Sequence, residues 1–404
     1  MRGLLLAWHR WFGLGAAGFL FVAGLTGAVI SWDHELDAWL NPAFYRATGS
    51  GPARPALELA REVEQADARL RVSYLPLHTA PGHAVLMSVV PRQDPATGIP
   101  AALDFNQMAV DPTDGRIQSR RMWGEVSLSR ENLLPFLYKL HYSMHLPLVA
   151  GVETGIVFMG IVGLLWVLDC LIAWVLSFPA RRTWRKSFQF RLRRGGAVMT
   201  YDLHRSGGVW VWPALLVVAI SSVGMNLEDE IMRPLVARFS ALTPAPTDLR
   251  RPVEPAQESD PALSATDAVT LAGAEAARRG WHAPAGGVFY SPAYSMYGVG
   301  FFAAGRDHGD GGLGNPWLYL DAHSGELLTA TEPGVGSAGD VFLQAQFPLH
   351  SGRIAGLPGR IFISLLGLAV AAVSVSGVLI WWRKRRVPLR RNAVMAAAPA
   401  RARL

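Results

Sequence analysis

The sequence predicts an α-helical membrane protein in which a four-helix transmembrane bundle carries two small α+β periplasmic domains, arranged as an internal duplication. Three observations lead to this fold class. Half of the 404 residues are hydrophobic and only 17% are charged, which is typical of integral membrane proteins. Four apolar stretches are long enough to cross a bilayer. The segments between them repeat one helix-and-strand pattern at matched offsets.

The predicted spans are uncharged windows. Residues 11–32, 206–227 and 361–382 each contain 22 residues without a charge, and residues 154–180 contain one charge, Asp169. A helix of roughly 20 apolar residues crosses the hydrocarbon core, so each window can span. The first window is longer than the apolar core of a signal peptide, and we expect it to be an uncleaved anchor.

The distribution of charge predicts the orientation. Residues 181–205 hold eight Lys or Arg against one acid, and residues 383–404 hold eight against none, whereas the two long segments at 33–134 and 228–353 contain more acids than bases. By the positive-inside rule, both termini and the 181–205 loop are cytoplasmic and the long segments are periplasmic. We therefore expect a multi-pass protein of the bacterial inner membrane, with the lipid bilayer and not nucleic acid as the partner of its basic residues.

The first long segment reads as a small α+β domain. Residues 55–68 show a weak helical period. Residues 71–76, 84–90 and 107–117 read as strands, the last turning through the motif that runs from Asp111 to Gly115.

The second long segment repeats this plan. A proline-rich linker at 243–261 precedes a predicted helix at 263–279 and strands near 287–291, 296–303 and 317–327. Asp321 and Gly325 match the earlier Asp and Gly of the turn at an offset of 210 residues. Such matched offsets indicate a duplicated chain, with chance agreement of short turns as the alternative.

The expected domain boundaries follow from these segments. They are a first transmembrane helix at 1–35, a first periplasmic domain at 36–135, an approach helix and second transmembrane helix at 136–180, a basic cytoplasmic loop at 181–205, a third transmembrane helix at 206–228, a second periplasmic domain at 229–345, a fourth transmembrane helix at 346–383 and a basic cytoplasmic tail at 384–404.

A histidine precedes or begins each apolar run. His9, His204 and His350 do so singly, while His141 and His145 lie four residues apart and are expected on one helical face. Pro147 is expected to break the helix between that pair and the second span. Any one of these histidines, taken alone, is also consistent with an amphipathic ring that lies at the lipid headgroups. The similar placement of four histidines favours the interpretation that they are metal ligands.

The motifs around these histidines resemble a known family. Trp8-His9-Arg10-Trp11, Leu140-His141-Tyr142-Ser143, Asp202-Leu203-His204-Arg205 and the segment Pro348–Arg353 are similar to the boundary motifs of the PepSY-associated transmembrane (PepSY_TM) family, and the two Asp-x-x-x-Gly turns are similar to its PepSY domains. The resemblance runs from about Leu6 to Arg386. Within the family, the chain most resembles inner-membrane siderophore-iron reductases that hold two haems b.

This resemblance implies two haem b cofactors with histidine axial ligands. A haem in a helical bundle takes one imidazole from each of two facing helices. By the predicted topology, His9 and His204 lie near the cytoplasmic side and form one pair, and His141 and His350 lie near the periplasmic side and form the other. The family motif matches His141. His145 stays open as an alternative ligand, a contact to substrate or propionate, or an interfacial residue. With both axial positions filled, electron transfer is outer-sphere and needs no catalytic side chain.

Other charged residues have two interpretations. Four arginines adjoin the predicted ligands: Arg10, Arg205, Arg353 and Arg360. Each could bind a haem propionate or be an ordinary charge at the membrane interface. Asp169, inside a span, is a functional candidate or a hydrogen-bond partner of a neighbouring helix.

The remaining motifs limit the chemistry. The only cysteine, Cys170, lies in a predicted span, so we expect no disulfides and no covalent haem attachment. His78 and His83 lack partners at zinc spacing. Exposed loops are expected at His282, His308 and His323. No phosphate-binding glycine motif follows a strand, so the electron donor would be a cytoplasmic protein or quinol.

The implied function is reduction of ferric siderophores at the periplasmic face, which releases Fe(II) for uptake because Fe(II) binds oxygen donors more weakly. Aromatic residues are candidates for substrate contact or for core packing: Trp123, Tyr142, Phe289, Tyr290 and Tyr294. The alternative is a haem-free membrane scaffold whose PepSY-like domains bind or inhibit a protein partner. A transporter is disfavoured because the spans lack breaks at the midplane.

Overall fold

The computed structural model describes residues 1–94, 97–253, 260–307, 309 and 311–396, with side chains at 192 and 387–396 left undescribed. The described chain divides into two compact units. The first comprises Met1–Ser31, Leu140–Glu228 and the residues from Ile361 on, and the second comprises Trp32–Lys139 and Asp229–Arg360. We call them the helical unit and the sheet unit.

Within the described residues, four helices are long and apolar enough to cross a membrane, as the uncharged windows predicted. They are α1 (Arg2–Ile30), α6 (Thr154–Ser177), a continuous segment Gly196–Asn226, and Arg353–Arg386 within and ahead of α13 (Gly356–Ala396). The third consists of α7 (Gly196–Asp202), a π-helical turn (Leu203–Gly207) and α8 (Gly208–Asn226). The chain is therefore a multi-pass membrane protein by helix length and composition.

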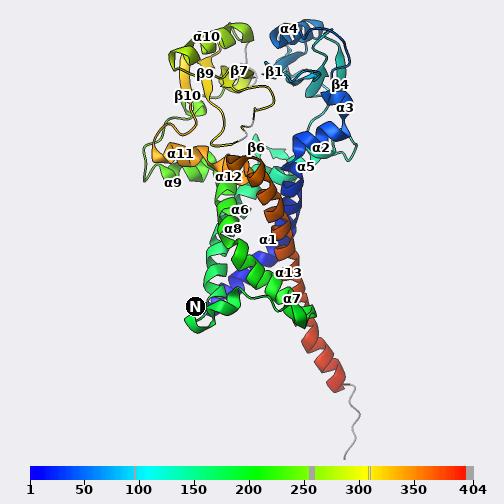
Figure 1. Cartoon of the computed structure of the whole chain (residues 1–404), viewed down its shortest axis with the longest axis vertical. Coiled ribbons are helices and arrows are strands. Elements are labelled where there is room, and N and C mark those ends of the chain that lie inside the picture. Colours follow the sequence, from blue (N-terminus) through cyan, green and yellow to red (C-terminus); the bar gives the residue numbers. More distant parts are fainter. Residues whose placement is uncertain (95–96, 254–259, 308, 310, 397–404) are drawn as a thin grey trace, which may run out of the picture. The chain divides into compact units, whose positions relative to one another are not determined.

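Glycines allow two close helix contacts in the helical unit, where α1, α6, α8 and α13 form the bundle drawn in Figure 1. A Cβ on Gly24 of α1 would lie 2.6 Å from the carbonyl oxygen of Gly367 of α13. A Cβ on Gly163 of α6 would lie 3.2 Å from Ser222 Oγ of α8. Small residues at such crossings let helix backbones approach and pack without a hydrophobic driving force between them.

The basic segment between α6 and the third span is more ordered than the loop expected there. It contains 3₁₀ helices at Arg181–Ser187 and Leu192–Arg194 and then α7. At the other end of the chain, α13 continues past Arg386 through the first part of the predicted tail.

The described part of the sheet unit contains one eight-stranded antiparallel sheet in the order β10-β9-β8-β7-β1-β2-β3-β4. Its first half has β1 (Leu70–Pro76), β2 (Val85–Pro91), β3 (Gln107–Val110) and β4 (Ile117–Arg121). Its second half has β7 (Ala285–Ser291), β8 (Met296–Phe301), β9 (Trp317–Asp321) and β10 (Leu327–Thr331). Six of these strands agree closely with the strands that the sequence predicts, whereas β4 and β10 extend beyond the predicted strand ends at residues 117 and 327.

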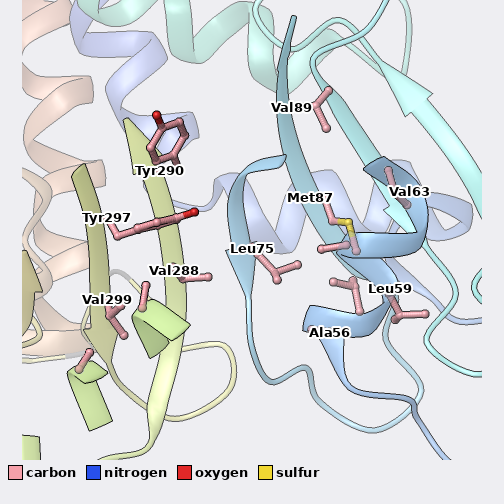
Figure 2. Close-up of a cluster of buried hydrophobic side chains, with 14 of the residues drawn as sticks. Ala56, Leu59, Val63, Leu75, Met87, Val89, Val288, Tyr290, Tyr297 and Val299 are labelled. Atoms are coloured by element: carbon pink, nitrogen blue, oxygen red, sulfur yellow. The ribbon is translucent and has the colours of Figure 1, made fainter. Parts of the chain in front are cut away.

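The two predicted α+β domains share this sheet. Strands β1 and β7 pair in antiparallel register, with Tyr74 opposite Phe289 and Leu75 opposite Val288. Helices α4 (Ala56–Ala66) and α10 (Ala265–Arg278) contribute side chains to a hydrophobic cluster drawn from both halves, part of which is shown in Figure 2. Pairing β1 with β7 removes two strand edges that would otherwise be exposed.

Two matching turns occur at equivalent places in the halves. Asp111 accepts backbone hydrogen bonds from Thr113 and Gly49, and Asp321 accepts them from His323 and Ser324. Each turn closes at a glycine with positive φ, 76° at residue 115 and 74° at residue 325. Glycine adopts this conformation without a Cβ clash, so the repeated Asp-x-x-x-Gly motif folds in the same way twice.

Short elements complete the chain. They are α2 (Asp33–Leu40), α3 (Pro42–Tyr45), α5 (Leu133–Ser143), β5 (Leu148–Val149), β6 (Val152–Glu153), η4 (Glu228–Met232), α9 (Arg233–Val236), η5 (Pro246–Leu249), η7 (Pro292–Tyr294), α11 (Ala338–Gln344), α12 (Gln346–Ser351) and η8 (Arg353–Ala355). The hairpin β5–β6 separates α5 from α6, which confirms the predicted break before the second span.

Candidate functional site

The helical unit brings together two of the histidines that the sequence paired. His9 lies on α1 and His204 lies on the π-helical turn between α7 and α8. Their ring centroids are 5.9 Å apart, with the planes inclined at 46°. A π-helical turn inside an α-helix often marks a functional position, and here it carries the second ring of the pair.

The ring of His204 is held by the neighbouring helix. Its Nδ1 lies 3.0 Å from the carbonyl oxygen of Val373 on α13. Because a carbonyl can only accept, Nδ1 is the donor, and in the neutral ring Nε2 is then an unprotonated acceptor. Within the part of the chain that the structure describes, no protein group hydrogen-bonds Nε2 of His204 or His9. Histidines that bind metals are typically fixed in this way through their other nitrogen.

Asp169 holds Nδ1 of His9, as the carbonyl of Val373 holds Nδ1 of His204. Its two carboxylate oxygens each lie 3.0 Å from Nδ1 of His9, and the carboxylate is buried. The sequence left two roles open for Asp169, a functional group or a hydrogen-bond partner of a neighbouring helix. The structure shows that Asp169 on α6 contacts His9 on α1, which is itself a predicted ligand. A single acid in an apolar span was the only sequence signal for this position.

Glycines shape the space around the paired rings. Gly13 and Gly208 each follow a ring histidine by four residues, and a Cβ added to either would have nothing within 4 Å. By contrast, a Cβ on Gly377 would lie 2.9 Å from Cε1 of His204. The indole Nε1 of Trp8, next to His9, is buried and has no acceptor among the described residues. The site therefore has open positions about one helical turn beyond each histidine, and one donor without an acceptor among the described residues.

His141, on α5, has a similar setting. Its Nδ1 lies 3.0 Å from the carbonyl oxygen of Ala23 and 3.1 Å from Thr26 Oγ1, both on α1. A Cβ on Gly27 would lie 2.9 Å from its Cε1. Burial lowers the pKa of His141 to about 4, so the ring is neutral near pH 7, the state that a metal requires of an imidazole ligand.

The expectation that His141 and His145 share a helical face is wrong. Helix α5 ends at Ser143, and both Met144 (φ 51°) and His145 (φ 53°) adopt left-handed backbone conformations. The side chain of His145 therefore does not follow the helical spacing from His141. His350 lies on α12 in the sheet unit, so its pairing with His141 stays a prediction.

The arginines near the histidines have partners of their own. Arg205 donates to the carbonyl oxygen of Ser177 at 2.9 Å and to Ser187 Oγ at 2.7 Å, which ties the end of α6 to the basic segment. Arg10 lies over the ring of Trp11. Arg353 lies 3.8 Å from Asp33, and Arg360 lies 2.8 Å from Glu35. Binding of haem propionates by any of these arginines stays a prediction.

The sheet unit contains a cleft of about 770 Å³. Three histidines, His34, His78 and His83, line it, as do Arg353 and Arg360. Aromatic side chains of Trp123 and Tyr138 also contribute. The mixture of polar and aromatic side chains is typical of a site for an organic ligand. Among the described residues, no group of three or more potential metal-binding side chains comes together.

The structure places the aromatic residues and the loop histidines of the sequence analysis in different environments. Tyr290 is only 5% exposed and packs in the core beside Tyr297 (Figure 2), so of its two interpretations core packing holds. Trp123 lines the cleft. His282 and His323 are exposed, as predicted. His308 lies outside the described residues.

Taken together, the fold and site define a multi-pass membrane protein with a bis-imidazole site in its helical unit and an antiparallel sheet unit. The sequence profile described as PepSY-associated TM region matches residues 6–384. The chain therefore belongs to the PepSY-associated transmembrane family. No curated protein matches the sequence.

Proposed function

We propose that this protein is a di-haem b electron-transfer protein of the inner membrane that reduces ferric iron in siderophore chelates on the periplasmic side. The observation that carries the proposal is the His9–His204 pair, with ring centroids 5.9 Å apart and Nδ1 of each ring fixed by another helix. Fe(II) released by the reduction is then taken up.

The residues of the pair fit a haem iron. Two imidazole nitrogens that each lie about 2 Å from one metal ion place their ring centroids roughly 6 Å apart. The open space at Gly13 and Gly208 leaves room for a flat macrocycle, and the unpartnered Trp8 Nε1 can donate to a propionate. Bound haem supplies one-electron chemistry. His9 and His204 would hold its iron, and with both imidazoles bound the metal would have no position for oxygen or substrate.

A second haem is proposed between His141 and His350. In support, the ring of His141 is neutral, buried and oriented by a backbone carbonyl, as the ring of His204 is. A haem near each membrane face divides the ~30 Å hydrocarbon core into shorter electron-transfer steps. The donor on the cytoplasmic side is a protein or quinol.

The substrate is proposed to bind in the cleft of the sheet unit. Its volume is about 770 Å³, and aromatic, imidazole and guanidinium groups line it together with the carboxylates of Asp33, Glu35, Asp37 and Asp307. This mixed polar and aromatic lining suits a large polar chelate. Reduction weakens the chelate because Fe(II) is a softer and less charged ion than Fe(III). In this proposal the two matched halves of the sheet descend from a duplicated domain.

Purification in detergent with a visible absorption spectrum tests the proposal. Two histidine pairs and no attachment cysteines predict about two haems per chain, extractable with acidified organic solvent. The reduced protein should be reoxidised by a ferric chelate in stopped flow. A haem content near zero, persisting after expression with added haem precursor, would overturn the proposal and favour the haem-free scaffold.

A further inference from the structure

Resting on the proposed function, we infer that Asp169 is a positioning and tuning residue. The negative charge that it places on His9 lowers the reduction potential of the His9–His204 haem below that of the haem held by His141. Electrons would then pass energetically downhill from the cytoplasmic to the periplasmic haem.

The inference begins with a difference between acceptors. Nδ1 of His204 and Nδ1 of His141 each lie 3.0 Å from a neutral backbone carbonyl, of Val373 and Ala23 respectively. Nδ1 of His9 lies 3.0 Å from both oxygens of a carboxylate. The distances are equal, so the distinguishing property of His9 is the charge of its partner.

A carboxylate affects the ring more strongly than a carbonyl does. Hydrogen bonds to an ionised acceptor are roughly twice as strong as neutral ones, and such a partner raises the basicity of a ligating imidazole. A more electron-donating ligand stabilises Fe(III) relative to Fe(II). The effect is large in a buried site, because the low dielectric of the protein interior strengthens electrostatic interactions.

The location of Asp169 supports a role that requires charge. It lies within α6, an apolar span whose only acid it is, and it is buried. A charged side chain in a span is costly, and a neutral asparagine or serine would be enough to join two helices. His204 shows that neutral groups, the Val373 carbonyl and the Ser376 hydroxyl, can orient a ring at this site.

The test compares Asp169→Asn with Asp169→Glu by haem count and optical redox titration of the full-length protein. Asp169→Asn keeps an acceptor but removes the charge, so the lower of the two potentials should rise while the higher one stays. Asp169→Glu restores the carboxylate and should keep the lower potential near its original value. Cys170→Ala, at the next buried position of α6, is the matched control and should change neither potential.

A second measurement does not depend on the folding of these variants. With Asp169 intact, the haem left in His141→Ala should have a lower potential than the haem left in His9→Ala. Equal or reversed potentials, or an Asp169→Asn protein with two haems and unchanged potentials, would overturn the inference while leaving the proposed function in place. Wild-type protein without haem would instead remove the proposed function.

Discussion

Gly27 of α1 lies directly against the imidazole of His141, where a Cβ would come within 2.9 Å of the ring carbon Cε1. Gly377 of α13 bears the same relation, at the same distance, to the imidazole of His204. Each glycine faces a histidine that the backbone of its own helix also holds through Nδ1. The helix surface therefore fixes both the position and the tautomer of the ring.

The first prediction concerns these two glycines. Gly377→Ala should displace His204 and lower occupancy of the cytoplasmic haem, and Gly27→Ala should do so for the periplasmic haem, each leaving roughly one haem per chain. Gly15→Ala is the control, since a Cβ there meets nothing within 4 Å. Haem extraction and the visible spectrum provide the measurement. Haem contents equal to that of the control would show that the rings tolerate the added methyl group.

The second prediction concerns the ligands. Alanine at His141 or His350 should leave roughly one haem, still reducible from the cytoplasmic side, and abolish reduction of an external ferric chelate. Alanine at His9 or His204 should leave the periplasmic haem chemically reducible but disconnected from the physiological donor.

His145→Ala serves as the control for this series, because His145 lies beyond the end of α5 and should not affect haem content. Loss of one haem from His145→Ala together with two haems in His141→Ala would reverse the assignment of the ligand. If every variant keeps both haems and full activity, these histidines are interfacial anchors only.

The third prediction concerns orientation. Reporters fused after Arg194 or Arg391 should report a cytoplasmic location, and reporters inserted near Gly98 or Gly311 a periplasmic one, because the basic segments flank the spans on one side. Two reporters measure this directly, one that is active only in the cytoplasm and one that is active only in the periplasm. A periplasmic 181–205 segment would invalidate the sorting of the histidines by side.

The fourth prediction concerns a buried ion pair in the sheet unit. Arg121 and Asp37, 3% and 5% exposed, lie 2.7 Å apart. Tyr45 also donates to Asp37, at 2.6 Å. Arg121→Ala should lower the free energy of unfolding by about 3–5 kcal/mol, because it leaves a buried carboxylate without its counter-charge.

The double variant Asp37→Ala/Arg121→Ala should recover much of that loss, since no lone charge remains buried. Arg69→Ala, which removes an exposed pair with Asp67, should change stability little. Thermal unfolding of the full-length protein in detergent, followed by circular dichroism, compares them. The prediction is contradicted if the double variant is less stable than Arg121→Ala by a further loss as large as the one that Arg121→Ala itself causes.

The fifth prediction concerns pH. Burial by itself raises the pKa of Asp111, but hydrogen bonds from Thr113, Gly49 and Thr48 outweigh it and hold that pKa well below its usual value. The stabilisation is complete above the unfolded-state pKa of about 3.9 and declines as pH falls below it toward the folded-state value. Asp111→Asn should be less stable near pH 7 and lose less stability on acidification. Denaturation midpoints between neutral and acidic pH measure both effects.

Local signals in the sequence were sufficient for much of the fold. Uncharged length located the four spans, because a helix needs a long apolar stretch to cross a bilayer. Strand and turn signals located six of the eight strands but not β4 and β10. In each turn the Asp accepts short-range hydrogen bonds and the Gly supplies the positive φ. Boundary histidines marked the His9–His204 pair, since their position at equivalent ends of two spans is itself a sequence property.

Only the tertiary structure decided what depends on contacts between distant residues. The pairing of β1 with β7 joins strands about two hundred residues apart, and nothing in either strand specifies its neighbour. The partnership of Asp169 with His9 likewise spans 160 residues. The end of α5 before His145 depends on left-handed backbone at residues that are not glycine, and the burial of Tyr290 depends on the packing around it. Sequence patterns report the preferences of one segment, whereas these features arise from the free energy of packing segments together.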